Sequence, residues 1–172
     1  MQTTQNEPIK HMNYWPYCIW FLAVVCLLFQ FLLQFSSGVM TGQLMDSFHL
    51  TATRAGFLAG SYYYVYVLLQ TPAGFLTDRF GPKMLLTVGC FLCCIGCLIF
   101  SHATTFIAAE MGRLLMGGSL AFAFVGMVYI TATMLPSNIF SLMIGLAETF
   151  ALIGVVVSEM YLAHTLEVLG WR

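Results

Sequence analysis

The sequence predicts an all-α fold, a polytopic bundle of membrane-spanning helices, and three observations lead to it. Of the 172 residues, 60% are hydrophobic and 8% are charged, whereas a soluble domain carries about 25% charged residues. The apolar residues form five long runs, and a helix of about 20 apolar residues can cross the hydrocarbon core of a bilayer. The net charge of −1 gives no electrostatic footprint for nucleic acid. We therefore expect membrane lipid, and no nucleic acid, around this chain.

Residues 1–13 are polar and are expected to form a cytoplasmic tail, with a helical bundle over residues 14–172. The first spanning helix is expected over residues 16–35, because this run is longer than the apolar segment of about 7–15 residues in a signal peptide. Four polar residues in and after its second half share one helical face. They are Gln30, Gln34, Ser37 and Thr41. This face is expected either to hydrogen-bond with neighbouring helices or to line a cavity.

The second helix is expected over residues 55–75 and is rich in tyrosine. Gly56 and Gly60 form a Gly-xxx-Gly ridge, which allows the backbone of another helix to approach closely. Three polar side chains share a face of this helix: Tyr63, Tyr66 and Gln70. They are expected either to belong to an aromatic belt at the membrane surface or to point inward toward a polar pocket.

The third helix is expected over residues 84–100. Four cysteines lie on one stripe of it: Cys90, Cys93, Cys94 and Cys97. A metal site, as in a membrane enzyme, would require thiolates, which are costly to place in hydrocarbon. The small thiols also suit close helix packing, together with Gly89 and Gly96. Packing is the preferred interpretation, and the metal-binding enzyme is the alternative.

The fourth and fifth helices, expected over residues 106–130 and 139–163, carry charged residues. Placing an arginine inside such a segment costs about 2.5–3.5 kcal/mol on insertion scales, which makes Arg113 a candidate functional residue. Glu110 is its nearest possible partner on the same helix, and the alternative is that Arg113 reaches the membrane surface. Glu148 lies near the middle of the fifth helix, where a carboxylate must be paired, protonated or in contact with water.

The end of the chain and the flanking charges predict a topology. Gly170-Trp171-Arg172 is expected to begin a sixth helix. Basic residues flanking the predicted helices are divided three to two between the sides: Lys10, Arg79 and Lys83 against Arg54 and Arg172. Positively charged flanks favour the cytoplasm. We expect a multi-pass protein of the inner (plasma) membrane with a cytoplasmic N-terminus.

A polar motif joins the second and third helices: Gly74-x-x-x-Asp78-Arg79-x-Gly81-x-Lys83. It resembles the signature loop of the major facilitator superfamily, although Pro82 stands where many members carry a basic residue. Arg113-x-x-x-Gly117-Gly118 is similar to the arginine–glycine motif of that family's fourth helix. The resemblance implies the N-terminal half of a twelve-helix protein, with five spanning helices and the start of a sixth.

The resemblance also implies roles for individual residues. Helices 1, 2, 4 and 5 would line a central cavity, and the cysteine-rich third helix would be peripheral. Five motif residues would form a gating loop rather than bind substrate: Gly74, Asp78, Arg79, Gly81 and Lys83. Arg113 and Glu148 would carry substrate charge or proton coupling. Hydrogen bonds to substrate or water would come from Gln30, Gln34, Tyr63, Tyr66 and Gln70. No catalytic residue, metal or cofactor is implied.

The expected function is secondary active transport of a small polar organic solute by alternating access, with H+ as a candidate coupling ion. The chain is expected to be a truncated fragment that lacks its C-terminal half. Its tyrosine run and the sequence of residues 70–82 are most similar to a bacterial branch related to a lysosomal dipeptide carrier. The alternatives are a non-transporting membrane remnant or scaffold, and a multidrug efflux carrier. The fifth helix lacks the Gly-Pro motif typical of drug–proton antiporters, so the efflux carrier is the less favoured interpretation.

Overall fold

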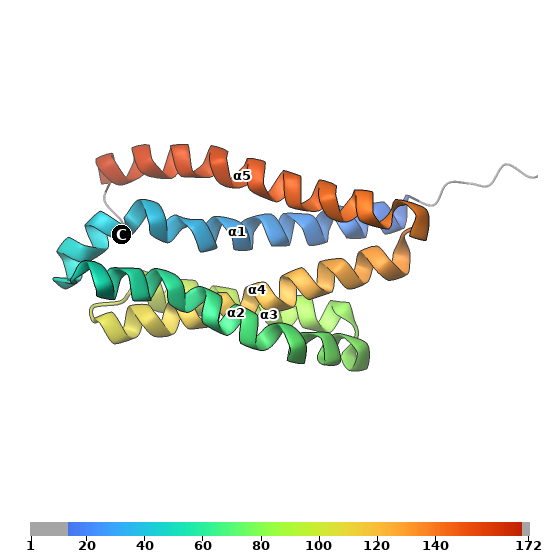
Figure 1. Ribbon diagram of the computed structural model, residues 1–172, viewed down its shortest axis with the longest axis horizontal. Helices are drawn as coiled ribbons and strands as arrows, with labels where there is room; N and C mark the ends of the chain where they lie inside the picture. Colours follow the sequence, from blue (N-terminus) through green and yellow to red (C-terminus); the bar gives the residue numbers. More distant parts are fainter. Residues whose placement is uncertain (1–13, 170–172) are drawn as a thin grey trace, which may run out of the picture.

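The structure, a computed structural model, describes residues 14–169 as a bundle of five α-helices that lie lengthwise beside one another (Figure 1). The elements are α1 (Trp15–Phe48), α2 (Ala52–Phe80), α3 (Pro82–Ser101), α4 (Phe106–Met134), the short 3-10 helix η1 (Ser137–Ile139) and α5 (Phe140–Leu169). The all-α prediction is therefore confirmed. The predicted tail, residues 1–13, and the predicted start of a sixth helix, residues 170–172, lie outside the described residues.

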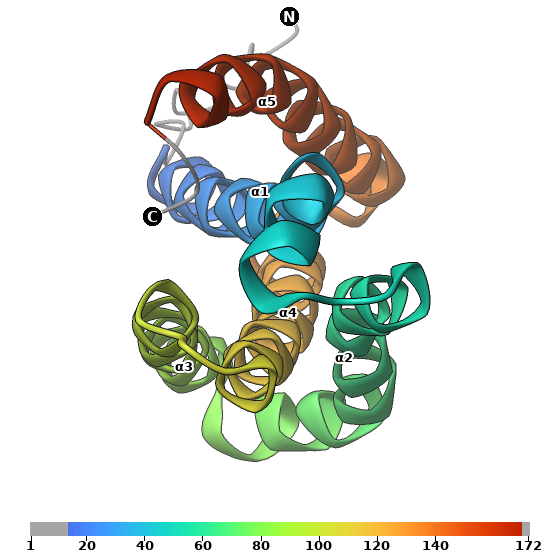
Figure 2. The same cartoon turned by 90° about the vertical axis from the view of Figure 1, so that its left-hand side faces the viewer.

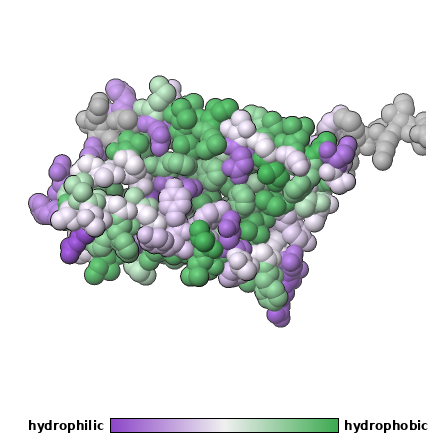
Figure 3. Space-filling model, viewed as in Figure 1, coloured by the Kyte–Doolittle hydropathy of each residue, from purple (hydrophilic) through white to green (hydrophobic). Residues whose placement is uncertain are grey.

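Four segments of the described chain are long and apolar enough to cross a membrane. They are Trp15–Phe48, Pro82–Ser101, Phe106–Met134 and Ser137–Leu162. The fifth predicted span, α2, is 29 residues long but does not meet this criterion, because tyrosines, Gln70 and terminal charges lower its hydropathy. On the face seen in Figure 3, hydrophobic residues cover much of the middle of the bundle and hydrophilic residues gather mostly toward its ends.

The helices extend further than the apolar runs predicted. The first was expected to end at residue 35 but continues to Phe48, and the second continues past residue 75 to Phe80. Hydropathy marks the part of a helix that lies in lipid, whereas backbone hydrogen bonding continues until a residue breaks it. Between α2 and α3 the break is Gly81, whose φ of +81° suits glycine, and Pro82 then occupies the first turn of α3.

The helices form two groups, which Figure 2 shows end-on. Helix α1 packs against α5, and α4 lies between α2 and α3 while also contacting α1. Helix α4 is the most buried of the four candidate spans, with 67% of its apolar window inside the bundle, against 22% for α3. Because the apolar window of Ser137–Leu162 has the same value of 22%, the peripheral position expected for the third helix stays a prediction.

Glycines set the closest contacts of α4. A Cβ atom added to Gly117 would collide with the backbone carbonyl of Tyr62 on α2. On the other side of α4, a Cβ on Gly96 of α3 would lie 2.9 Å from the carbonyl oxygen of Gly112. Gly89 is equally close-packed, with Phe122 Cβ at 3.2 Å. The predicted close packing of the third helix is thus confirmed.

No other helix among the described residues packs on the glycine ridge predicted for the second helix. A Cβ on Gly56 would meet nothing within 4 Å, and one on Gly60 would meet only the ring of Tyr64 on its own helix. The contact with α4 is made one turn further on, at Tyr62. A Gly-xxx-Gly pattern permits close approach but does not say which face of a helix meets a neighbour.

Candidate functional site

Arg113 lies inside the bundle and binds the backbone of α1. Its side chain is 2% exposed. Nη1 donates to the carbonyl of Leu33 at 2.8 Å, and Nη2 donates to the carbonyl of Gln34 at 3.3 Å and to Ser37 Oγ at 2.9 Å. The structure therefore does not show the alternative in which Arg113 reaches the membrane surface.

The predicted partner, Glu110, acts electrostatically on the guanidinium of Arg113. The described hydrogen bonds of Arg113 go to α1, and the Oε2 atom of Glu110 is buried without a hydrogen-bond partner. The guanidinium instead lies over the ring of Tyr62, with 5.0 Å from Cζ to the ring centroid. Stacking its planar group on an aromatic ring and donating several hydrogen bonds in one plane are both properties of arginine that lysine lacks.

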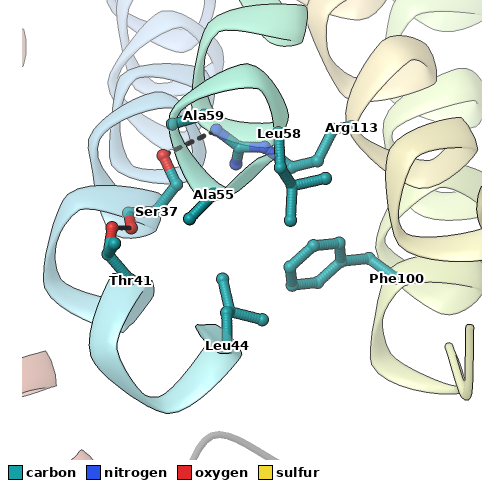
Figure 4. A pocket seen from close by; sticks show the side chains of 8 residues that line it. All are labelled: Ser37, Thr41, Leu44, Ala55, Leu58, Ala59, Phe100 and Arg113. Atoms are coloured by element: carbon teal, nitrogen blue, oxygen red, sulfur yellow. Dashed lines mark hydrogen bonds between the residues drawn. The ribbon is translucent and has the colours of Figure 1, made fainter. Parts of the chain in front are cut away.

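A small void of about 10 Å³ adjoins this contact (Figure 4). Arg113 points toward Ser37, and Thr41 donates to the carbonyl of Ser37 at 2.7 Å. Leu44, Leu58 and other apolar side chains close the void, which has room for about one water molecule. A solute larger than water does not fit here, so this part of the interface is a seam between helices.

Gln30 lies in a second buried contact along the same face of α1. Its Oε1 accepts from Ser119 Oγ of α4 at 2.8 Å, and the Tyr62 hydroxyl of α2 donates to its backbone carbonyl at 3.1 Å. Gln34 is also buried, and its Oε1 atom has no hydrogen-bond partner. Of the two interpretations left open for this face, hydrogen bonding between helices describes Gln30. The proposed contact of Gln30 and Gln34 with substrate stays a prediction.

Tyr62 and Ser119 are functional neighbours that sequence reasoning missed. Tyr62 contacts Gln30, Arg113 and the backbone at Gly117, and its side chain is fully buried. Its position four residues before Tyr66 placed it close to the predicted polar face. The available signal was therefore the tyrosine run itself, which does not say which ring is innermost.

A different set of polar groups gathers where α2 and α5 flank α1 and α4. Gln70 Nε2 donates to the Tyr66 hydroxyl at 2.7 Å, one turn away on α2. The carboxyl group of Glu148, on α5, acts electrostatically on Tyr66. All three side chains are half-buried. The structure therefore pairs Tyr66 with Gln70, places Glu148 within electrostatic range of Tyr66, and gives none of these three described residues a hydrogen bond to Arg113.

Tyr63 belongs fully neither to the Arg113 seam nor to the polar group around Tyr66. Its side chain is 42% exposed, and its ring lies edge-on to that of Tyr62 at 6.2 Å between centroids. Gly145 of α5, one turn before Glu148, is also open, because a Cβ there would meet nothing within 4 Å. This side of α5 is thus not covered by the described part of the chain.

The signature motif lies on helix ends rather than on a loop. Gly74, Asp78 and Arg79 belong to the last turns of α2, Gly81 alone separates the helices, and Lys83 is in the first turn of α3. Asp78, Arg79 and Lys83 are all exposed, and Arg79 lies over the ring of Phe80 at 5.5 Å. The term gating loop is corrected accordingly to a helix–Gly–helix junction.

The cysteines of α3 divide between two environments. Cys93 is buried and Cys97 half-buried, whereas Cys90 and Cys94 are exposed. Over residues 14–169, no group of three or more His, Cys, Asp or Glu side chains is placed to hold a metal ion. The described residues thus give the metal-site alternative no geometric support.

These features define a multi-pass helical membrane protein with polar groups in its interior. Residues 19–172 match the Major Facilitator Superfamily, and the chain belongs to that family. It is also 32% identical over 142 residues to the "Uncharacterized transporter YybO" of Bacillus subtilis (strain 168). The alignment covers 78% of this chain and 31% of the length of that relative. The family match places the chain in this superfamily, and the name of the relative describes a transporter.

Proposed function

We propose that the chain forms part of the N-terminal half of a secondary active transporter, which moves a small polar organic solute by alternating access. Membership of the family supports the class of activity. Because the chain spans 31% of the length of its relative, we propose that a C-terminal half supplies the facing wall of the cavity. In such proteins the two halves rock around a site near the middle of the membrane.

The observation that carries this proposal is the meeting of Glu148, Tyr66 and Gln70. A carboxyl group inside a candidate span is costly unless it is paired, protonated or in contact with water. Tyr66 and Gln70 already bond each other, so their remaining donors and acceptors and the open carboxyl group can face a solute. We propose that Glu148 binds either a proton or a positively charged group of the solute.

Arg113 acts in this proposal through α1. Its Nη atoms already bond three acceptors of α1, and its Tyr62 contact fills one face of the guanidinium. We infer that Arg113 holds α1 against α4 and α2 and so positions the cavity wall. This assignment replaces direct binding of substrate charge.

The finer relationship and the topology are part of the same proposal. We infer that the solute is an amino acid or short peptide, as in the bacterial branch related to the lysosomal dipeptide carrier. Tyr62–Tyr64 and the motif residues support this inference by resemblance. Figure 1 places the start of α1 and the α2–α3 junction at the same end of the bundle, and we propose that this end faces the cytoplasm, where exposed Asp78 and Arg79 would contact the other half.

Uptake by the full-length protein in proteoliposomes tests the proposal. Glu148→Gln is expected to abolish uptake driven by a proton gradient, because the amide cannot gain or lose the proton or hold a cation. Glu159→Gln is the matched control on the same helix. A mixture of radiolabelled amino acids and dipeptides serves as substrate. Equal uptake by wild type and Glu148→Gln contradicts the role of Glu148, and the absence of any flux in wild type contradicts the transport assignment.

A further inference from the structure

Two cysteines on different helices line the same groove. Cys26 of α1 and Cys90 of α3 both line a groove of about 370 Å³. Most of its other lining side chains are apolar, and Lys83 is the charged one among them. The thiols of Cys26 and Cys90 also lie within electrostatic range of each other. Both cysteines are free.

The other thiol neighbours on α3 are poorly placed for a disulfide. Cys90 and Cys94, like Cys93 and Cys97, stand four positions apart on one helix. Such positions have Cβ atoms about 5–6 Å apart, whereas a disulfide needs a Cβ separation of about 3.5–4.5 Å. A regular helix cannot meet this requirement. Cys26 and Cys90 lie on different helices, α1 and α3, so the fixed spacing within one helix does not limit their separation.

We propose that Cys26 and Cys90 form an oxidation site, in which a lipid-soluble hydroperoxide converts the two thiols into a disulfide between α1 and α3. The groove favours this product over a bound metal ion. A metal would require two thiolates to persist among apolar side chains, at a high desolvation cost, whereas a disulfide is uncharged. The oxidation needs only one transient thiolate.

The reaction balances with the hydroperoxide as the sole oxidant. The exposed Cys90 attacks the terminal oxygen, the O–O bond breaks, and the departing alkoxide takes the Cys90 proton to leave as an alcohol. Cys26 then attacks the sulfur of the sulfenic acid. The S–O bond breaks, and the hydroxide leaves with the Cys26 proton as water. Two thiols and one hydroperoxide thus give one disulfide, one alcohol and one water.

The bond would join two helices that are otherwise held separately. Helix α3 packs mainly on α4 and also on α2, whereas α1 packs on α5 and α4. Lys83 lies in the first turn of α3, and Cys90 lies two turns further along the same helix. The disulfide therefore attaches the helix that follows the Asp78–Lys83 junction directly to α1, next to the groove.

Cross-linking in the full-length protein tests this proposal. A protease site is inserted between α1 and α2, in residues 49–51, and the protein in liposomes is treated with cumene hydroperoxide and then cut. One variant keeps only Cys26 and Cys90, and a matched control keeps only Cys18 and Cys90. The first is expected to remain a single band on a non-reducing gel and to separate when dithiothreitol is added. The control is expected to separate without reductant.

Mass spectrometry of the protein with all six cysteines and the same cut site gives a second measurement, in case the multiple substitutions prevent folding. A peptide pair linked through Cys26 and Cys90 is expected after oxidation, present in Cys18→Ala and absent in Cys26→Ala. Separation of the Cys26/Cys90 variant without reductant overturns the proposal. So does a different linked pair in the six-cysteine protein, or no linked pair at all.

Discussion

At the scale of single residues, the most informative side chain is Arg113. Its type and position mark it in the sequence as unusual for a membrane helix. Its partners, however, lie 76 to 80 positions earlier in the chain, and two of the three are backbone carbonyls. Composition and spacing carry no information about such contacts. The same limit explains why Glu110, one turn away, was the expected partner.

Arg113→Lys is expected to destabilise the bundle, although it keeps the positive charge. Lysine cannot reach Leu33, Gln34 and Ser37 together in the geometry of a guanidinium. Interhelical hydrogen bonds in membranes average about 0.6 kcal/mol each, so the loss of three corresponds to roughly 2 kcal/mol. Thermal unfolding in detergent measures the effect, with Arg54→Lys at the exposed start of α2 as control. A melting temperature equal to that of wild type contradicts the role of Arg113 in holding α1.

At the scale of elements, each helix was predicted from its apolar run, but the residues at which the helices begin and end were not. Thr51 and Thr105 cap the starts of α2 and α4 by accepting from Arg54 N and Ala108 N, while α1 ends at His49, which has a φ of +52°, and α2 ends at Gly81. The close packing of α3 followed from its small residues. The face that α2 turns toward α4 could not be predicted from the sequence, because the tyrosine run and the glycine ridge of α2 were equally plausible as contacts.

Gly117→Ala is expected to weaken the contact between α2 and α4. The added methyl group collides with the carbonyl of Tyr62, and overpacking of this kind costs about 1–3 kcal/mol. Gly145→Ala provides the matched control, since its Cβ has open space and alanine is the better helix former by about 1 kcal/mol. Thermal unfolding should therefore move in opposite directions for the two variants. A Gly117→Ala protein as stable as wild type would show that the helices separate without cost.

At the scale of the whole molecule, the bundle has a polar seam and a separate open polar group. Arg113 and Gln30 hold α1 to α4, while Tyr66, Gln70 and Glu148 lie together between α2 and α5. The sequence predicted both sets as one cavity lining, because helical faces show which residues share a side but not how far a neighbouring helix covers it. Family membership followed from a short motif of glycines and charges.

Asp78→Asn is expected to reduce transport by the full-length protein at least severalfold while leaving membrane insertion unchanged. Asp78 is exposed at the end of α2, so removing its charge disturbs no internal contact of this half. Its expected contact is with the other half, where the charge would hold one state of the transport cycle. Initial uptake rates are compared with those of Asp46→Asn, an exposed acid near the end of α1. Wild-type turnover in Asp78→Asn contradicts the gating role.

The distance along the chain between Arg113 and its acceptors has a consequence for biosynthesis. Leu33 is made 80 residues before Arg113, which at 5–20 residues per second is an interval of roughly 4–16 s. During that time the newborn first helix sits in the membrane with glutamines that have no α4 beside them. The nascent polypeptide at this stage is the form of the protein that insertion factors and quality-control proteases are best placed to recognise.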